Sequence, residues 1–230
     1  NNWRGIIFND ESIDDECTMT RCQVRFGGYN NLGGINCYNA SPTISDCIIS
    51  NNYFGFYLKN ASDPTITGNT IGSSVITPIA MSIEANPTFS NNVLSSSDNQ
   101  YDAIGILGGD IVADAFLPVR TVTDIENITY LLLGVVRVPE NLSLTVAPGV
   151  VIKSTTYDHF LLIDGEILMN GTSENPIVMT SVKDDMYGNP NDTNKDGSLT
   201  APTVGDWGGM LMRETSSDQS VFNHCIFRYA

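Results

Sequence analysis

Three short segments of the chain have nearly the same sequence and begin at regular intervals. Ser-Pro-Thr-Ile-Ser-Asp-Cys-Ile-Ile at 41–49 is followed by Asp-Pro-Thr-Ile-Thr-Gly-Asn-Thr-Ile at 63–71 and Asn-Pro-Thr-Phe-Ser-Asn-Asn-Val-Leu at 86–94. Their prolines are 22 and 23 residues apart. A period in the low twenties indicates stacked repeats, in which each repeat is one turn, or rung, of a coil. One rung of a parallel β-helix needs about that many residues.

Equivalent positions of the repeat form three columns of side chains. Stacked rungs place equivalent residues about 4.8 Å apart. Two columns are apolar and are predicted to face the core, and the column between them is predicted to lie at a corner. An Asn there tolerates a left-handed backbone and can hydrogen-bond the neighbouring rung. The columns are Ile44, Ile66 and Phe89; Cys47, Asn69 and Asn92; and Ile49, Ile71 and Leu94.

A second, longer repeat relates the two ends of the chain. Trp3-Arg-Gly-Ile-Ile-Phe matches Trp207-Gly-Gly-Met-Leu-Met, at an offset of 204 residues. Further matches pair Met19 with Phe222, Cys22 with Cys225 and Val24 with Phe227, at an offset of 203. We therefore expect a second copy of the unit to begin near 207, and we expect open ends with unpaired backbone groups. Such ends predict end-to-end stacking of copies, or excision from a longer polypeptide.

Strand patterns are predicted along almost the whole chain, and no segment has the pattern of a helix. Residues 1–115 are predicted to form regular rungs. From 116 to 230 the same coil is predicted to continue with another type of repeat, because leucine and β-branched runs alternate with Pro-Gly, Asp-Gly and Asn-Gly turns. The whole is expected to be one elongated domain with a long polar loop at 183–206, and its last part, 207–230, starts the next repeat unit.

Four segments of the second half resemble a known family. They are Leu144-Thr-Val-Ala-Pro-Gly-Val-Val-Ile-Lys, Asp164-Gly-Glu-Ile-Leu-Met-Asn-Gly-Thr, Asn175-Pro-Ile-Val-Met-Thr-Ser and Gly205-Asp-Trp-Gly-Gly-Met. This succession resembles the right-handed parallel β-helix repeat proteins of prokaryotic cell surfaces, in the pectin-lyase-like superfamily. The resemblance covers nearly the entire chain and implies an all-β fold, a single-stranded right-handed parallel β-helix with open ends. It implies little about function, because the superfamily includes polysaccharide lyases, hydrolases, tailspikes, adhesins and surface proteins without known activity.

Charge and composition indicate a secreted surface protein. The chain has 26 acidic and 11 basic residues and a net charge of −15, although only 16% of its residues are charged. Such a field repels nucleic acid and anionic membranes, and it favours cations. The longest apolar stretch, Tyr130 to Val138, contains Gly134 and Arg137 and is too short to span a bilayer. We expect an extracellular or cell-surface location in a prokaryote, with no nucleic-acid partner and no membrane insertion.

The five cysteines are predicted to be reduced. Cys22, Cys47 and Cys225 fall in the corner column, Cys17 takes the slot of Pro42 in its own rung, and Cys37 lies on a different face. The column thiols are predicted to be buried and to pack as small hydrophobes without a bond, and a bridge between Cys22 and Cys47 is the alternative. Because the chain contains no Cys-x-x-Cys pair, a thiolate metal site is not expected.

The polar loop at 183–206 is too long for a simple corner, and long loops of this kind are usually functional or disordered. Inside it, Asp192-Thr-Asn-Lys-Asp-Gly-Ser has the Asp-x-Asn-x-Asp-Gly form of a calcium loop. Alternation places the oxygens of Asp192, Asn194 and Asp196 on one side, and Gly197 allows the sharp turn. The alternative is a solvated turn rich in Asp and Asn.

The calcium loop is incomplete in sequence. Thr203 stands where a bidentate Glu is expected, so an ion would need further ligands. The nearest candidates are Asp184, Asp185 and Asp206. A Ca²⁺ held there is predicted to be structural, since it would pin a loop that its own negative charge would otherwise spread apart.

No catalytic or cofactor-binding residue is predicted. The Asn-Thr-Asp, His-Gly and Arg-Ile-Lys signatures of the related hydrolases are absent from the sequence. Acidic pairs exist at Asp14-Asp15 and Asp184-Asp185, but His159 and His224 are predicted to be structural or exposed. A polysaccharide lyase or hydrolase is the alternative from another class.

Two surface features bear on partners. Tyr29, Tyr53, Phe54, Phe56 and Tyr57 cluster in the first rungs, and aromatic rings exposed on a strand face can stack on sugars. Alternation predicts that only some of them point outward. Six triplets of the Asn-x-Ser/Thr type are candidate glycosylation sites. They begin at Asn39, Asn60, Asn127, Asn141, Asn170 and Asn191.

The function predicted from these features is that of a structural or adhesive extracellular protein. Its units are expected to stack end to end into a fibre, sheath or long surface rod, so its main partner is another copy of itself. A carbohydrate-active β-helix enzyme and a glycan-binding module that recognises surface glycans are the alternatives.

Overall fold

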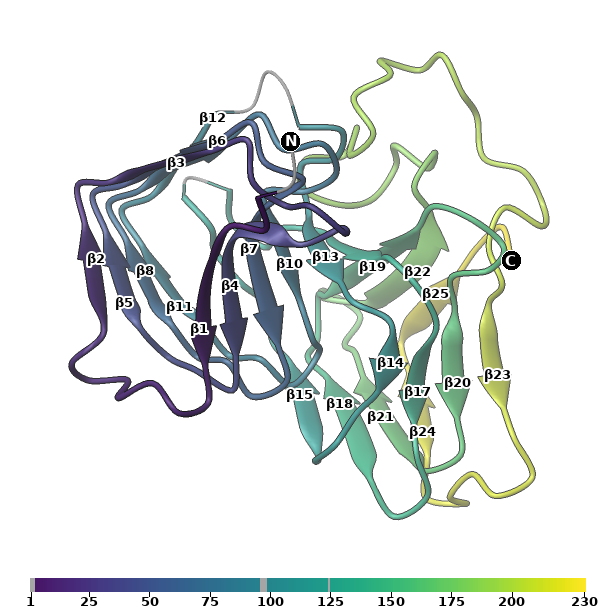
Figure 1. Ribbon diagram of the computed structural model, residues 1–230. Coiled ribbons are helices and arrows are strands. Elements are labelled where there is room, and N and C mark those ends of the chain that lie inside the picture. The colour runs from purple at the N-terminus through teal and green to yellow at the C-terminus, as the bar shows by residue number, and fades with distance from the viewer. Residues whose placement is uncertain (1–2, 96–98, 124) are drawn as a thin grey trace. The chain divides into compact units, whose positions relative to one another are not determined.

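The computed structural model describes residues 3–95, 99–123 and 125–230, and every regular element in these ranges is a β-strand (Figure 1). The strands are parallel and stack as a right-handed solenoid of about 7 turns. Within the described ranges there is no helix that could cross a membrane. The prediction of an all-β parallel coil without helices is confirmed.

The chain forms two compact units. The first comprises Asn1–Ile104 and Thr121–Glu126, and the second comprises Gly105–Arg120 and Asn127–Ala230. Strand β13 (Ile104–Ile106) lies where the chain leaves the first unit. Each unit is built from rungs of three strands, one strand in each of three parallel sheets.

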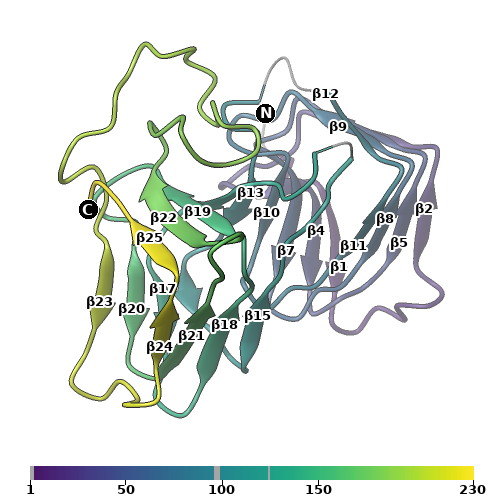
Figure 2. The ribbon, with the colours of Figure 1, turned by 180° about the vertical axis from the view of Figure 1, so that it is seen from behind.

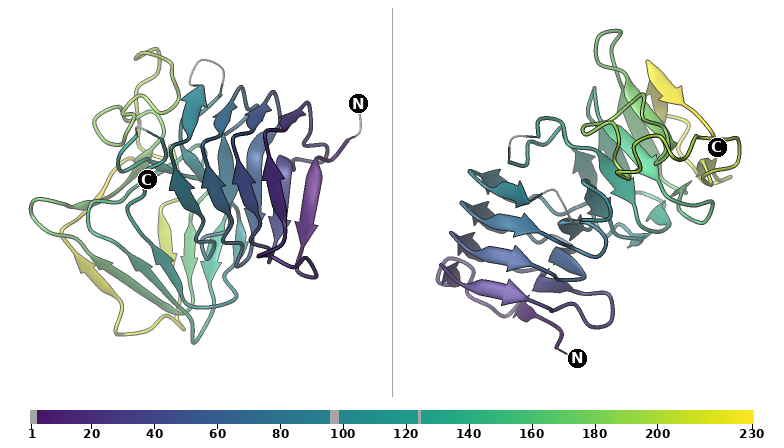
Figure 3. Two further views of the ribbon diagram at one scale, coloured as in Figure 1. Left: turned by 90° about the vertical axis from the view of Figure 1, so that its left-hand side faces the viewer. Right: turned by 90° about the horizontal axis from the view of Figure 1, so that it is seen from above.

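The first unit contributes four strands to each of its three sheets, and these strands lie parallel to one another (Figure 3). One sheet contains β1 (Ile6–Asn9), β4 (Gly33–Tyr38), β7 (Phe54–Lys59) and β10 (Ile79–Met81). The second contains β2 (Thr18–Thr20), β5 (Thr43–Ser45), β8 (Thr65–Thr67) and β11 (Thr88–Ser90). The third contains β3 (Gln23–Arg25), β6 (Ile48–Ser50), β9 (Thr70–Gly72) and β12 (Val93–Ser95).

The second unit repeats this arrangement (Figure 2). Strands β16 (Tyr130–Leu132), β19 (Val151–Ser154), β22 (Ile177–Ser181) and β25 (Cys225–Phe227) belong to one nine-stranded parallel sheet, which also contains β1, β4, β7, β10 and β13. Another contains β14 (Gly109–Asp110), β17 (Val136–Val138), β20 (Leu161–Ile163) and β23 (Met210–Met212). The last contains β15 (Ala115–Leu117), β18 (Ser143–Val146), β21 (Glu166–Asn170) and β24 (Val221–Asn223).

The predicted apolar columns are present. Ile44 pairs in register with Ile66, and Ile66 pairs with Phe89. In the neighbouring sheet Ile49 pairs with Ile71 in the same way. All five side chains face the interior, and the four isoleucines are fully buried. Because equivalent side chains lie directly over one another, each rung buries its apolar residues against the next.

The corner column forms a continuous hydrogen-bonded ladder, which we call the corner ladder. It consists of Cys22, Cys47, Asn69 and Asn92. The Cys22 N–H donates to Cys47 Sγ at 3.4 Å, the Cys47 N–H to Asn69 Oδ1 at 2.9 Å, and the Asn69 N–H to Asn92 Oδ1 at 3.0 Å. Each backbone donor therefore finds its acceptor on the side chain of the next rung in the chain direction.

The left-handed backbone predicted for the corner Asn lies one residue earlier. Arg21, Asp46 and Asn91 have φ angles of 55°, 53° and 52°, and Gly68 has 67°. The residue before the corner makes the sharp turn, which points the following side chain inward along the ladder. The corner Asn is needed for its amide group and not for its backbone freedom.

All five cysteines are free, as predicted. Only Cys37 and Cys47 are fully buried, whereas Cys22 is exposed and Cys17 and Cys225 are partly so. Burial raises the pKa of the Cys37 thiol to about 12, so this thiol stays protonated at neutral pH. The expectation that column thiols are buried is wrong for Cys22, because no described residue stacks over its outer side in the first rung.

Candidate functional site

The polar segment 183–206 forms a long loop that contains no strand and is visible beside β19 and β22 (Figure 2). It lies against residues that precede or belong to strands of the second unit. The Asn189 N–H donates to Thr129 Oγ1 at 2.8 Å, and Lys153 Nζ donates to Asn191 O at 2.6 Å. These hydrogen bonds hold the loop against the strands of the second unit.

Three carboxylates of this loop lie close together. One oxygen each of Asp185, Asp192 and Asp196 lies within 4.8 Å of the other two, and we call these residues the acidic cluster. Asp192 accepts the N–H groups of Asp196 and Gly197 at 3.0 and 2.9 Å, as in a tight Asp-containing turn. The spacing of Asp192 and Asp196 read from the sequence thus corresponds to a real cluster, and Asp185 joins it.

Two oxygen atoms in this region have no hydrogen-bond donor. Asp185 Oδ1 and Asn194 Oδ1 are both buried and unpaired. Burial raises the pKa of Asp185, and the nearby Asp192 carboxylate raises it further. Asn194 instead donates its amide N–H to Asp196 Oδ2 at 2.9 Å. A hard cation would give these oxygens the partner that the protein does not provide.

The other two predicted ligands are engaged elsewhere. Asp184 accepts the Thr180 hydroxyl at 2.7 Å and lies 3.5 Å from the Arg228 guanidinium. Asp206 forms an ion pair with Lys183 at 2.8 Å. Burial alone would raise the pKa of Asp206, but hydrogen bonds, that from Lys183 first, hold it at about 2. The structure therefore brings Asp185, Asp192 and Asp196 together and leaves Asp184 and Asp206 outside the cluster.

A buried lysine lies beneath the loop, and no sequence motif points to it. Lys153 of β19 is fully buried. Burial lowers its pKa to about 8, although the carboxylates of Asp185, Asp184 and Asp192 act in the opposite direction. Its ammonium group supplies positive charge close to the acidic cluster at neutral pH.

We expect wild-type stability relative to Lys153→Met to rise between pH 8 and pH 10.5. An unfolded lysine keeps its proton up to about pH 10.5, whereas folded Lys153 loses it near pH 8. The unfolded chain then binds more protons in this window, so stability increases with pH. Urea unfolding of both proteins across the window measures the difference. A difference that stays constant or falls would contradict this account of Lys153.

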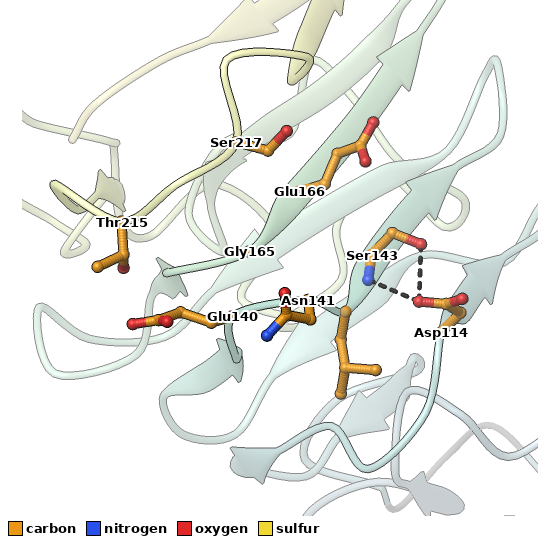
Figure 4. A pocket seen from close by; sticks show the side chains of 9 residues that line it. Asp114, Glu140, Asn141, Ser143, Gly165, Glu166, Thr215 and Ser217 are labelled. Atoms are coloured by element: carbon orange, nitrogen blue, oxygen red, sulfur yellow. Dashed lines mark hydrogen bonds between the residues drawn. The ribbon is translucent and has the colours of Figure 1, made fainter.

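A polar groove of about 390 Å³ lies at the corners of the second unit (Figure 4). Its lining comprises Asp114, Glu140, Asn141, Leu142, Ser143, Gly165, Glu166, Thr215 and Ser217. Asp114 accepts both the N–H and the hydroxyl of Ser143, at 2.8 and 3.0 Å. The side chains of Glu140 and Glu166 point in different directions in Figure 4. None of the nine lining residues is Lys, Arg or His, so the groove lacks a basic side chain to accept a proton.

Two family models match the chain. One, described as a right handed beta helix region, matches residues 1–112, and the other, a pectate-lyase like beta helix domain, matches residues 118–217. The chain is a pectin-lyase-like β-helix repeat protein. Searches of curated proteins and of solved structures found no match. The family includes enzymes, and membership in it gives the fold without a specific activity.

The first and last rungs of this β-helix repeat protein have the same local structure. We use these names for residues 3–26 and 207–229. Trp3 Nε1 donates to Arg25 O at 3.1 Å, and Trp207 Nε1 donates to Arg228 O at 2.7 Å. The longer repeat predicted from the sequence is therefore reproduced in its hydrogen bonds.

Further details agree between the two rungs. The Cys22 thiol donates to Thr20 O and the Cys225 thiol to Asn223 O, both at 3.4 Å. Left-handed backbone occurs at equivalent places in both rungs. The equivalent pairs are Gly5 and Gly209, Arg21 and His224, and Phe26 and Tyr229. His224 thus stands at a left-handed position just before the corner residue Cys225.

The last rung carries an apolar hollow of about 320 Å³. Its lining comprises Trp207, Gly209, Met210, Met212, Phe222, Phe227 and Ala230. Phe222 and Phe227 are 44% and 45% exposed, and their rings pack edge to face with centroids 6.1 Å apart. In the first rung the equivalent residues Met19 and Val24 are buried, and they pair with Ile44 and Ile49 of the second rung, residues 27–50. The hollow is thus an exposed apolar surface whose equivalents at Met19 and Val24 pack against a neighbouring rung.

The aromatic cluster of the first unit is partly core, as alternation predicted. Phe54 and Phe56 are buried, whereas Tyr29 is exposed. The ring of Tyr57 packs against Tyr38 and Phe54 with centroids 6.0 and 6.2 Å away. Phe54 and Phe56 are therefore core residues, whereas Tyr53 and Tyr57 are partly exposed.

The remaining candidate residues differ in accessibility. His159 Nδ1 lies 3.0 Å from Leu132 O and 2.9 Å from Thr155 Oγ1, which is a structural role. Among the six sequons, four are exposed, at Asn39, Asn141, Asn170 and Asn191. Asn60 is half-buried, and Asn127 uses its amide nitrogen to hydrogen-bond Gly149 O at 2.8 Å. A glycan on Asn127 would break this bond.

Proposed function

We propose that the protein is a structural or adhesive extracellular unit of a long β-helical rod. In this proposal copies of the repeat continue one another end to end, and the main partner is another copy of the same unit. The observation that supports it best is the equivalence of the first rung and the last rung. The last rung has the same local structure as the first rung. Its outer surface therefore resembles the surface of the first rung that packs against residues 27–50, and a further copy could pack there.

Physical chemistry favours this association. The apolar hollow of the last rung leaves Phe222 and Phe227 nearly half exposed. Burying apolar area contributes about 25 cal/mol per Å². A terminal strand also carries unpaired N–H and C=O groups that pair readily with another strand. Stacking would satisfy both requirements with contacts that already occur between rungs inside the chain.

Sedimentation velocity of residues 1–230 over a wide concentration range tests the proposal. We expect elongated species that grow with concentration, because a head-to-tail contact does not close on itself. A single 25.0 kDa species at every concentration would contradict the proposal.

A carbohydrate-active enzyme is the second candidate, and the three carboxylates of the groove favour it. Glycosidases use paired carboxylates as acid and base on either side of the scissile bond. The divergent side chains of Glu140 and Glu166 argue against such a pair. Incubation with polyuronates and neutral glycans should therefore give no products, and cleavage that Glu166→Gln abolishes would establish the enzyme instead.

We also propose that the acidic loop holds a structural Ca²⁺. Support comes from the acidic cluster and from the unpaired oxygens of Asp185 and Asn194. Carboxylate and amide oxygens are the ligands that Ca²⁺ prefers. An ion there would neutralise repulsion among Asp185, Asp192 and Asp196 and would hold the loop closed.

Millimolar Ca²⁺ is expected to raise the melting temperature and to protect residues 183–206 from proteolysis. At about 100 times the dissociation constant, binding adds about 2.7 kcal/mol to stability. Asp192→Asn should abolish the shift, whereas Asp218→Asn, an exposed aspartate outside the loop, should retain it. If EDTA changes neither melting nor protease sensitivity of the wild type, the calcium site does not exist.

An extracellular location in a prokaryote remains part of the proposal. The net charge of −15 and the abundance of small polar residues support it. Native material is expected to carry glycans at two or more of the exposed sequons Asn39, Asn141, Asn170 and Asn191. Peptide mass spectrometry would identify them, and fully unmodified sequons would remove this support.

A further inference from the structure

We infer that copies join head to tail, with β23, β24 and β25 of one copy pairing in parallel with β1, β2 and β3 of the next. The inference rests on the proposed function and adds to it the polarity and the register of the contact. It places each residue of the last rung over the equivalent residue in the first rung of the next copy. Met210, Phe222 and Phe227 lie against Ile6, Met19 and Val24 of the next copy.

The register follows from pairings within the chain. Each rung of the first unit sets equivalent residues opposite one another, as in the pairs Met19 with Ile44 and Val24 with Ile49. The last rung is equivalent to the first, so the same rule sets Phe222 opposite Met19 and Phe227 opposite Val24 of the next copy. The joint thereby continues both apolar columns.

The polarity follows from the corner ladder. At every step in the ladder the N–H of one corner donates to the side chain of the next corner toward the C-terminus. In the head-to-tail joint the N–H of Cys225 would donate to Sγ of Cys22 in the next copy, just as the Cys22 N–H donates to Cys47 Sγ within the chain. A contact between two like ends would reverse the strands and break this direction.

The acceptor needed at the joint is accessible. Cys22 is exposed, whereas its ladder neighbours Cys47, Asn69 and Asn92 are buried. Inside the chain the Cys47 thiol also donates to Met19 O in the rung before it, at 3.6 Å. By the same geometry, Cys22 of the next copy would donate to the carbonyl of Phe222. Cys22 is therefore the residue through which the joint can be strengthened or blocked.

One substitution should strengthen the joint. Asn accepts the ladder N–H at 2.9 to 3.0 Å, whereas Cys accepts it at 3.4 Å. Asn92 also donates its amide to Ile66 O at 2.8 Å. Cys22→Asn should therefore tighten association about fivefold to tenfold. A like-end contact gives no reason for this gain.

Two charge substitutions should each block one end. Cys22→Arg places a large cation on the exposed outer side of the first rung, and Phe227→Arg does the same in the apolar hollow of the last rung. Both side chains are exposed, so each variant should fold as a monomer, which circular dichroism checks. We expect each to weaken self-association about a hundredfold or more, because a charge would be buried without a partner. Phe222→Arg serves as a second block of the last rung.

Mixing the blocked variants under reducing conditions tests polarity. Cys22→Arg retains a free last rung and Phe227→Arg retains a free first rung, so an equal mixture should form a heterodimer and nothing larger. The inference is overturned if either variant alone dimerises as tightly as the wild type associates, or if the mixture stays monomeric while the wild type associates. A wild type that is itself monomeric overturns the proposed function, and this inference with it.

Discussion

Asn69→Ala is expected to lower the free energy of unfolding by about 3 kcal/mol. Asn69 is fully buried, and its Oδ1 accepts the Cys47 N–H at 2.9 Å. Its amide donates to Ile44 O at 2.9 Å and to Asn92 Oδ1 at 3.1 Å. Alanine leaves the Cys47 N–H buried without its acceptor and removes the amide donor to Ile44 O, whereas Asn92 Oδ1 still accepts the N–H of residue 69. A buried group without a partner costs about 1–3 kcal/mol. Equilibrium urea unfolding followed by circular dichroism measures the loss.

The chain supplies its own control for this substitution. Cys47 occupies the same ladder position one rung earlier, where its Sγ accepts an N–H at 3.4 Å. Asn69→Cys keeps a weak acceptor and donor in place, so it should cost about half as much as Asn69→Ala. If Asn69→Ala stays within about 0.5 kcal/mol of the wild type, the ladder does not stabilise the coil as described.

Trp207→Ala is expected to cost about 3–5 kcal/mol. The Trp207 side chain is 1% exposed, and its indole N–H donates to Arg228 O at 2.7 Å. Truncation removes a large buried ring and leaves an unpaired carbonyl. Measurement by denaturant unfolding at low protein concentration keeps association from contributing to the result.

Trp3→Ala is the matched control because Trp3 makes the equivalent hydrogen bond to Arg25 O in the first rung. Trp3 is 42% exposed, so its truncation creates less buried cavity. We expect a loss of less than about half that of Trp207→Ala. Equal losses of unfolding free energy for the two variants would mean that the different burial of Trp3 and Trp207 does not affect stability.

Much of the fold could be predicted from the sequence because the repeat constrains it. The period of the Pro-Thr segments predicted the rung, and the columns through Ile44 and Ile49 predicted which side chains stack. A period of this kind carries long-range information, since residues about 22 positions apart must be neighbours. The match between Trp3 and Trp207 predicted the equivalence of the terminal rungs for the same reason.

The loop geometry could be predicted only in part. The motif selected Asp192 and Asp196, but adjacency in sequence favoured Asp184 and Asp185 equally. Only the structure shows that Thr180 and Arg228 engage Asp184. Lys153 lies 38 residues before its partner Asn191, and no repeat relates the two. Contacts between an irregular loop and a strand leave no periodic signal.

The corner geometry was missed for another reason. Asn is common both at left-handed positions and in side-chain ladders, so its presence did not separate the two roles. The residue before it, which carries the positive φ, varies among Arg21, Asp46, Gly68 and Asn91. Asn52 makes a similar contact between rungs at another corner, where its side-chain oxygen accepts the Gly27 N–H at 2.8 Å. It was not identified from the sequence because it lies outside the Pro-Thr segments.

Electron cryomicroscopy of concentrated protein tests most directly whether units continue one another. We expect filaments one coil wide in which the strand spacing of about 4.8 Å runs unbroken across each junction between copies. Discrete particles at all concentrations, or filaments whose strand spacing is interrupted at every junction, would contradict it.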